Sequence, residues 1–469
     1  MLERVAATWD DDVLPALVDY IRIPAVSVAF DPDWERHGHI DAAVEHVRAW
    51  CAARPIEGIQ VEVVRLPGRT PVIVVEVPGT DGAAGPDQDT VLLYGHLDKQ
   101  PEMTGWREGL GPWTPVRDGD ALYGRGGADD GYAAFAALTA LEAVRADGGA
   151  HARCVLLVEA SEESGSPDLP AYVEALAPRI GPVSLVVCLD SGCATYDRLW
   201  VTTSLRGLAS VVLRVDVLTE GVHSGSASGI VPSSFRVLRR LLDRIEDPDT
   251  GRILVPDLLG DPSPARLAQV RATAEELGDG ITASWPFAGG TQAMTTDPTE
   301  ALLNRTWRPT LSVVGMDGIP SIVDGGNVLR PTTAASLSFR LPPGVDAHRA
   351  GDAVVEALEA DPLHGAQVRA ELVEAADGWE APDLRPWLAE ALDAASQESF
   401  GADARFIGEG GSIPFMGMLG ERFPDAQFVV TGVLGPGSNA HGPNEMLHVP
   451  TAQRVTASVA RLLAAHVRR

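Results

Sequence analysis

Residues 91–98 read VLLYGHLD, an apolar run that ends on a histidine and an aspartate two residues apart. The run is typical of a buried β-strand. Residues i and i+2 of an extended segment point to the same side, so His96 and Asp98 could face a common point. Such a pair also occurs in ordinary solvated loops, so the rest of the chain decides between a functional site and a surface turn.

Strand and helix patterns alternate on both sides of this stretch, up to about residue 200. Apolar strand-like runs lie at 71–77, 153–160 and 184–190, and helical patterns lie at 131–147 and 169–180. This alternation predicts an α/β fold, with a mixed sheet covered by helices on both faces.

The pattern changes after residue 205. The segment that follows has the strands and helices of a small α+β domain, with strand patterns at 310–315, 334–341 and 366–375 and helical patterns at 233–247, 265–278 and 346–361. We therefore expect an inserted domain at 206–384. The alternating pattern then returns, so residues 1–205 and 385–469 are expected to form the larger domain.

Length and composition narrow the class of protein. A chain of 469 residues is expected to form two domains, and 45% hydrophobic and 22% charged residues are typical of a globular protein. The formal charge of −28 argues against nucleic-acid partners and anionic membranes, which require a basic face. No apolar run approaches the length of a membrane span, and the N-terminus lacks the pattern of a signal peptide, which predicts a cytoplasmic protein.

Four of the strand-like runs end on side chains that can bind a metal ion or carry a proton. These side chains are His96 and Asp98 after the first run, then Glu162 and Glu163, Asp190, and His441. The functional crevice of an open α/β sheet lies at the carboxyl ends of its strands. Zinc binds histidine nitrogen and carboxylate oxygen, and a carboxylate can bridge two ions. The inventory of two histidines and several carboxylates suits such a site, and it leaves one carboxylate as the general base that a metal-bound water requires.

The stretch LYGRGGADDG, which contains Asp129 and Asp130, leads into a predicted helix. An aspartate here could simply cap that helix. The GRGG turn could also indicate a phosphate loop and hence a nucleotide-binding oxidoreductase. It lacks the G-x-G-x-x-G order after a strand, which makes this alternative weak.

Eight motifs occur in order along nearly the whole chain: GHLD, GRGGADDG, EASEESGS, LDSG, HSG, SFRLPP, GEGGSIP and NAHGPNE. Together they resemble the carnosinase-type branch of the di-zinc metallopeptidases, which includes cytosolic nonspecific dipeptidases, aminoacylases and carboxypeptidase G. The resemblance implies a catalytic domain with an inserted lid and dimerisation domain.

The resemblance also implies a role for each matching residue. His96 and Asp190 would hold one metal ion, Glu163 and His441 the other, with Asp129 bridging. Glu162 would be the general base. Asp98 would lie behind His96 and fix its tautomer, as carboxylates often do for metal-bound imidazoles.

Four further matches concern the substrate. His223 resembles a lid histidine that hydrogen-bonds the developing oxyanion, although it could be an ordinary loop histidine. Arg340 and Asn327 match lid residues that contact the substrate carboxylate, and Ser412 lies in a glycine-rich turn that could bind the same group. Taken alone, Arg340 would be a surface charge on a strand.

Two positions depart from the family pattern. Gly131 and Tyr132 follow the paired aspartates where many relatives have a lysine, and Lys99 stands where dipeptidase relatives commonly have a small apolar residue. Lys99 is the only lysine of the chain, and it could be merely a surface neighbour of the site. Both departures bear on the substrate rather than on the reaction.

The predicted function is metal-dependent hydrolysis of an amide bond in dipeptides or short peptides with a free carboxylate. The cofactors would be two divalent ions, Zn²⁺ first, with Mn²⁺ or Co²⁺ as alternatives. A homodimer through the inserted domain is expected, in which His223 could act in the partner's site. The alternatives are an N-acyl-amino-acid deacylase or N-carbamoyl amidase with the same site, and a catalytically inactive binding relative, against which the intact Glu162 speaks.

Overall fold

The computed structural model describes residues 1–81, 88–283, 285–411 and 414–469. These residues form two compact units, each with its own hydrophobic core. The first unit comprises Met1–Thr203, Ala381–Ile407 and Met418–Arg469, and the second comprises Ser204–Glu380 and Gly408–Gly417. None of the helices in the described part of the chain has the length and apolar character needed to span a bilayer.

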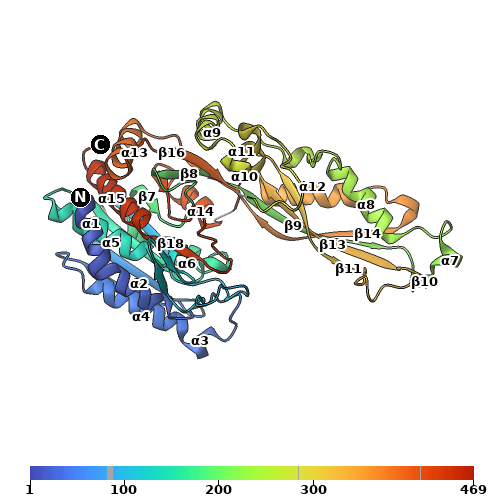
Figure 1. Cartoon of the computed structure of the whole chain (residues 1–469), viewed down its shortest axis with the longest axis horizontal. Helices are drawn as coiled ribbons and strands as arrows, with labels where there is room; N and C mark the ends of the chain where they lie inside the picture. Colours follow the sequence, from blue (N-terminus) through green and yellow to red (C-terminus); the bar gives the residue numbers. More distant parts are fainter. Residues whose placement is uncertain (82–87, 284, 412–413) are drawn as a thin grey trace. The chain divides into compact units, whose positions relative to one another are not determined.

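The first unit is built on a mixed β-sheet (Figure 1). Its strands are, in spatial order, β1 (Gln60–Val64), β2 (Val72–Val77), β6 (Arg153–Glu159), β3 (Thr90–His96), β7 (Val183–Cys188), β17 (Gln427–Val430), β8 (Trp200–Leu205) and β15 (Trp379–Glu380), and β16 (Arg405–Glu409) also pairs with β8. The run β6-β3-β7-β17 is parallel, whereas β1, β2 and β8 pair antiparallel with their neighbours. The carboxyl ends of the parallel strands therefore meet at one edge.

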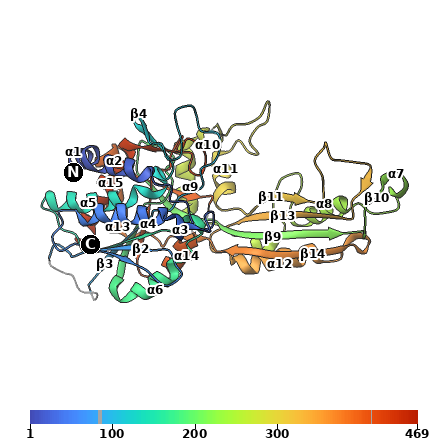
Figure 2. The ribbon, with the colours of Figure 1, turned by 90° about the horizontal axis from the view of Figure 1, so that it is seen from below.

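Helices cover both faces of this sheet. The larger ones are α4 (His39–Ala52), α5 (Ala133–Ala146), α6 (Leu169–Ile180), α13 (Pro386–Phe400) and α15 (Val449–His466). Figure 2 shows α4, α5, α13 and α15 on one face and α6 on the other. Every residue of β3 and β6 is buried, as expected for parallel strands covered on both sides. The predicted α/β fold class is confirmed.

Two smaller parts of the first unit support the carboxyl edge. At the N-terminus, α1 (Leu2–Thr8), the π-helical turn η1 (Trp9–Val13) and α2 (Leu14–Ile21) follow one another. A small antiparallel sheet pairs β4 (Val116–Asp118), β5 (Ala121–Tyr123) and β18 (Met446–His448). The pairing of β5 with β18 joins the segment before Asp129 to the segment after His441.

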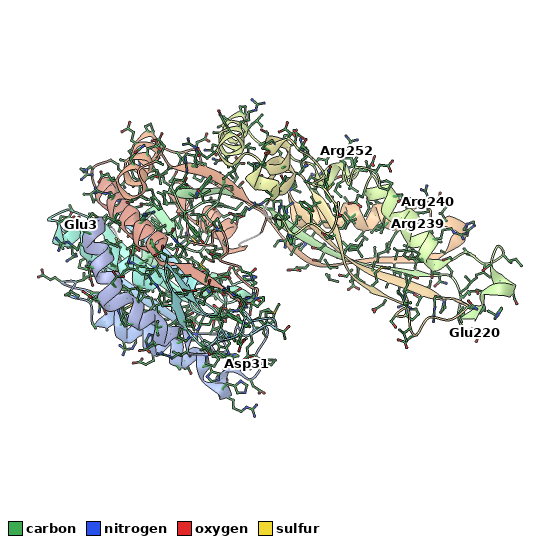
Figure 3. All side chains as sticks on the ribbon, viewed as in Figure 1. Glu3, Asp31, Glu220, Arg239, Arg240 and Arg252 are labelled. Carbon is green, nitrogen blue, oxygen red and sulfur yellow. The ribbon has the colours of Figure 1, made fainter. Side chains whose placement is uncertain are left out.

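The second unit contains an antiparallel sheet in the order β11-β13-β9-β14. Its elements are β9 (Gly207–Asp216), β11 (Thr310–Asp317), β13 (Thr332–Leu341), β14 (Gln367–Ala376), α8 (Ser234–Ile245) and α12 (Ala347–Glu359). Alternate residues of β9 and β13 pack with both helices in one hydrophobic core. The exposed arginines of α8, including Arg239 and Arg240, lie on its outer side (Figure 3).

Two further parts complete this unit. The helices α9 (Pro264–Leu277), α10 (Gly280–Ala283) and α11 (Pro298–Thr306) share a separate small core. A two-stranded ribbon of β10 (Val222–His223) and β12 (Val328–Leu329) leads into α7 (Ser224–Ala227). Figure 1 shows this ribbon at one end of β9 and β13.

Candidate metal centre

Five segments of the first unit deliver histidine and carboxylate side chains to the carboxyl edge of the sheet. His96 is the last residue of β3, and Asp190 follows β7. Glu163 lies in the 3₁₀ turn η3 (Glu162–Ser164) after β6, and Asp129 lies in the turn η2 (Gly127–Gly131) before α5. His441 lies in the loop between β17 and β18. Parallel pairing brings these loops together although the chain separates them widely.

The side chains form two groups that share Asp129. In one group, His96 Nε2 lies 3.4 Å from Asp129 Oδ1 and 3.7 Å from Asp190 Oδ2. In the other, His441 Nε2 lies 3.0 Å from Asp129 Oδ2 and 3.3 Å from Glu163 Oε2. Each group therefore has three potential ligand atoms, and Asp129 offers one oxygen to each.

These residues fit divalent metal ions. Two ligand atoms on one tetrahedral zinc lie roughly 3.3 Å apart, which agrees with the separations in both groups. The imidazole atom His96 Nε2 is buried, and among the described residues it makes no hydrogen bond. A donor set of imidazole and carboxylate, without thiolate, suits Zn²⁺ and also Mn²⁺ or Co²⁺.

The second nitrogen of His96 explains why Nε2 is available. His96 Nδ1 lies 3.1 Å from the main-chain oxygen of Asp98. A carbonyl oxygen only accepts hydrogen bonds, so the proton of the neutral ring sits on Nδ1 and the lone pair of Nε2 faces the carboxylates.

The carboxylate of Asp98 lies farther from the ring, with Oδ1 at 3.5 Å from Nδ1. Its two oxygens accept hydrogen bonds from the main-chain amides of Glu162 and Glu163, at 3.1 and 3.0 Å. Asp98 thus joins the loop after β3 to the turn η3, in addition to lying behind His96.

Burial and mutual repulsion raise the pKa of three carboxyl groups at this edge. Burial raises the pKa of Asp190 to about 6. Burial and the charge of Asp190 raise the pKa of Glu162 well above its usual range, and burial and the charge of Asp129 do the same for Glu163. Burial also opposes ionisation of Asp129, but the two histidines outweigh it and hold the pKa of Asp129 below its usual range. Bound cations would relieve this crowding of acids.

The structure places the predicted substrate residues in the second unit or outside the described chain. His223 pairs with Val328 in the ribbon, and Ser224 N donates to the main-chain oxygen of Asn327 at 2.9 Å, so His223 and Asn327 are close. Arg340 lies near the opposite end of β13, where it pairs with Thr310 and Leu208. Ser412 lies outside the described residues.

Two contacts beside the metal groups involve residues that were not predicted as site residues from the sequence. Gln100 Nε2 donates to Glu163 Oε2 at 2.6 Å, which orients that carboxylate. Arg125 and Glu445 form a buried ion pair of 2.7 Å, and Arg125 also donates to the main-chain oxygen of Gly442, next to His441. Arg125 and Glu445 lie within quoted motifs, but nothing in the sequence pairs residues 320 positions apart.

The histidines and carboxylates at the carboxyl edge of the mixed sheet define a candidate site for divalent metal ions. Residues 92–465 match the model of peptidase family M20/M25/M40, and the chain belongs to this family. The predicted resemblance to a metallopeptidase family is thereby confirmed.

Curated relatives are dipeptidases. The chain is 30% identical over 387 residues to the cysteinylglycine-S-conjugate dipeptidase of Corynebacterium striatum, covering 78% of this chain and 80% of the relative. It is 27% identical over 364 residues to the Beta-Ala-His dipeptidase of Homo sapiens, covering 75% and 69%.

Solved structures share the fold. The dipeptidase Dug1p from Saccharomyces cerevisiae matches with a TM-score of 0.76 at 22% identity, covering 100% of this chain and 99% of that one. The metallo-carboxypeptidase Sso-CP2 from Sulfolobus solfataricus matches with a TM-score of 0.77 at 20% identity, covering 98% and 100%.

Proposed function

We propose that this peptidase hydrolyses dipeptides or short peptides with a free carboxylate, using two divalent ions, Zn²⁺ in the first instance. The observation that carries the proposal is Asp129, whose two oxygens face two separate groups of potential ligands. A carboxylate in this arrangement is suited to bridge two ions. The curated relatives support dipeptides as the substrate class, because their names specify dipeptide hydrolysis.

The residues of the first unit divide into ligands and a base. His96 and Asp190 would hold one ion, Glu163 and His441 the other, and Asp129 both. When bound, the ions polarise the scissile carbonyl and lower the pKa of water. Glu162 Oε2 lies 4.0 Å from His96 Nε2, farther away than the ligand carboxylates of that group. Glu162 would take a proton from the attacking water and transfer it to the leaving amine.

The second unit would supply the substrate contacts. Arg340, Asn327 and Ser412 are proposed to bind the substrate carboxylate, and His223 to stabilise the oxyanion. Thr332 and Arg340 are eight residues apart on β13, which is roughly 26 Å of strand, and the His223 ribbon lies beyond Thr332. A dipeptide spans only about 7 Å. One chain therefore cannot place both His223 and Arg340 on the same dipeptide.

A homodimer would resolve this separation, with His223 and the neighbouring Asn327 of one chain reaching the partner's substrate. The outer strand of the sheet supports such an assembly. β11 stands at the end of the strand order and exposes Val313, Val314 and Met316, with exposed fractions of 46%, 65% and 43%. An edge strand with an apolar exposed surface favours pairing with another chain.

The test is a substrate screen on metal-loaded protein. Dipeptides and N-acyl or N-carbamoyl amino acids would be compared with Zn²⁺, Mn²⁺ and Co²⁺ in turn, and bound metal would be measured after desalting. We expect about two ions per chain and dipeptides as the better substrates. Less than one tightly bound ion per chain would contradict the di-metal site. Preference for N-acyl amino acids would reassign the protein as a deacylase.

A further inference from the structure

Lys99 lies inside the first unit rather than on its surface, with 0% exposure. The interpretation of Lys99 as a surface neighbour is therefore wrong. Its ammonium group donates to three main-chain oxygens, those of Tyr20 at 2.9 Å, Ile21 at 3.4 Å and Ile23 at 2.8 Å. These oxygens lie at and just beyond the carboxyl end of α2.

This arrangement satisfies both partners. The last carbonyl oxygens of a helix have no N–H partner within the helix, and they lie at the negative end of the helix dipole. Burial lowers the pKa of Lys99, and the three carbonyl oxygens oppose this effect, because an ammonium group has three N–H donors and no acceptor. The Nζ atom also lies 4.0 Å from the centre of the Tyr20 ring, which adds a cation–π contact.

Main-chain hydrogen bonds join the same two segments beside the Lys99 side chain. Lys99 N donates to the oxygen of Ala25 at 2.9 Å, and Ser27 N donates to the oxygen of Lys99 at 2.9 Å. The hydroxyl of Tyr20 donates to the oxygen of Leu97 at 2.8 Å. The loop that carries His96 and Asp98 is thus held against the end of α2.

The loop that carries Asp129 also packs against Lys99 and Tyr20. A Cβ atom at Gly126 would come within 2.7 Å of the Lys99 side chain, and one at Gly131 within 2.1 Å of the Tyr20 ring. These glycines let the loop approach Lys99 and Tyr20 closely. Lys99 therefore contacts both the end of α2, which holds the loop of His96 and Asp98, and Gly126 in the loop that leads to Asp129.

We infer that Lys99 is a positioning residue, whose ammonium group fixes the end of α2 so that His96 and Asp129 keep the separation that a metal ion requires. The inference rests on the proposed metal-dependent function. Lys99 would act through these two residues, without touching substrate or metal.

The first test compares Lys99→Met with a matched control, Arg153→Met. Arg153 is also a buried cation that closes a helix end, because it donates to the main-chain oxygens of Arg179 and Ile180 at the end of α6. Arg153 opens β6, so it lies at the edge opposite to the metal groups. Both variants lose a helix-closing cation, and Arg153→Met also loses an ion pair with Glu76, but only Lys99→Met removes a cation beside the candidate centre.

Zn²⁺ affinity would be measured by calorimetry with a competing chelator, and kcat and KM with a dipeptide. We expect Lys99→Met to bind Zn²⁺ at least about tenfold more weakly than wild type, and its kcat to change by a larger factor than its KM. Arg153→Met should keep the wild-type Zn²⁺ affinity, kcat and KM per folded molecule. Equal values for Lys99→Met and wild type, or equal losses in both variants, would overturn the inference while leaving the proposed function intact. A wild-type protein that binds no Zn²⁺ would overturn both.

A second measurement does not depend on a variant that folds. Because Lys99 is the only lysine, lysine labelled with ¹⁵N at Nζ gives one side-chain nitrogen signal in the NMR spectrum of the wild-type protein. We expect that signal to shift when Zn²⁺ alone is added, and not when Mg²⁺ replaces it at the same ionic strength. A Lys99 signal that is unchanged by saturating Zn²⁺ would contradict the inference.

Discussion

Glu162 and Glu163 are adjacent in the sequence but lie in different surroundings. The carboxylate of Glu163 accepts a hydrogen bond of 2.6 Å from the side-chain amide of Gln100, and its Oε2 lies 3.3 Å from His441 Nε2. Glu162 has a longer separation of 4.0 Å from His96 Nε2. The turn η3 directs the two carboxylates to different groups, which is why we assign one as ligand and the other as base.

Substitution of each glutamate separates the two roles. Glu162→Gln should retain both ions, because no ligand is lost, and kcat should fall by about two orders of magnitude or more when the base is removed. Glu163→Gln should instead lose bound metal, because an amide is a poorer ligand than a carboxylate. Elemental analysis and steady-state kinetics on both proteins check this. The opposite pattern would reverse the assignment.

Which side chains gather at the candidate metal centre could be predicted from the sequence, whereas their detailed contacts could not. The apolar runs before His96 and Asp190 are sharp enough to place both residues at strand ends. The sequence did not reveal that Asp98 accepts two amides of the turn η3, because this depends on the path of a loop 64 residues away. It also gave no sign that the only lysine is buried, because lysine is usually exposed.

At the scale of elements, the fold class could be predicted because the buried strands have distinctive sequences. A parallel strand covered on both faces consists almost entirely of apolar residues, so β3 and β6 are recognisable without any knowledge of their partners. The spatial order of the strands cannot be recognised in the same way, because β6 lies between β2 and β3 although it follows both in the chain. That order depends on the crossover helices, which the apolar pattern alone does not specify.

The last helix, α15, carries a buried histidine that should make the first unit acid-sensitive. His466 is fully buried, and its Nε2 lies 2.8 Å from Ser184 Oγ. Burial, together with the nearby charge of Arg469, lowers the pKa of His466 to about 4. The unfolded chain has a histidine pKa of about 6.5, so between these values the unfolded state binds more protons. Stability from neutral His466 is therefore complete above about pH 6.5 and is lost as the pH falls toward 4.

Removal of the titrating group tests this expectation. The free energy of unfolding of the wild-type protein should fall between pH 6.5 and 4, with a contribution from His466 of up to about 3 kcal/mol. His466→Gln can still hydrogen-bond Ser184 but does not titrate, so its stability should depend less on pH in this window. Urea unfolding of both proteins at several pH values gives the comparison. Parallel curves would contradict a role for His466.

At the scale of the whole molecule, the sheet of the second unit sets a distance that no single chain can span with a dipeptide. His223 and Asn327 lie beyond one end of β13, and Arg340 lies roughly 26 Å along it from Thr332. If both ends contact substrate, they contact different substrates. The dimer proposal therefore follows from the length of β13 as well as from the exposed edge of β11.

Complementation between two inactive variants can decide whether His223 acts in the partner's site. Glu162→Gln lacks the base and His223→Ala lacks the oxyanion contact, so each homodimer should be nearly inactive. In a mixed dimer, the site that retains Glu162 receives an intact His223 from the other chain. Random mixing makes about half of the dimers mixed, each with one complete site, which gives about a quarter of wild-type activity.

The matched control for this experiment pairs Glu162→Gln with Asp129→Ala. Both changes lie in the first unit, so neither chain can complete the other's site through the second unit. This mixture should stay inactive, which separates a supplied histidine from a general stabilising effect of dimer formation. Mixed dimers would be verified by differential tags and native mass spectrometry. If mixed Glu162→Gln and His223→Ala dimers form but show no activity, His223 does not act across the dimer, and the separation along β13 then excludes it from any dipeptide that Arg340 binds.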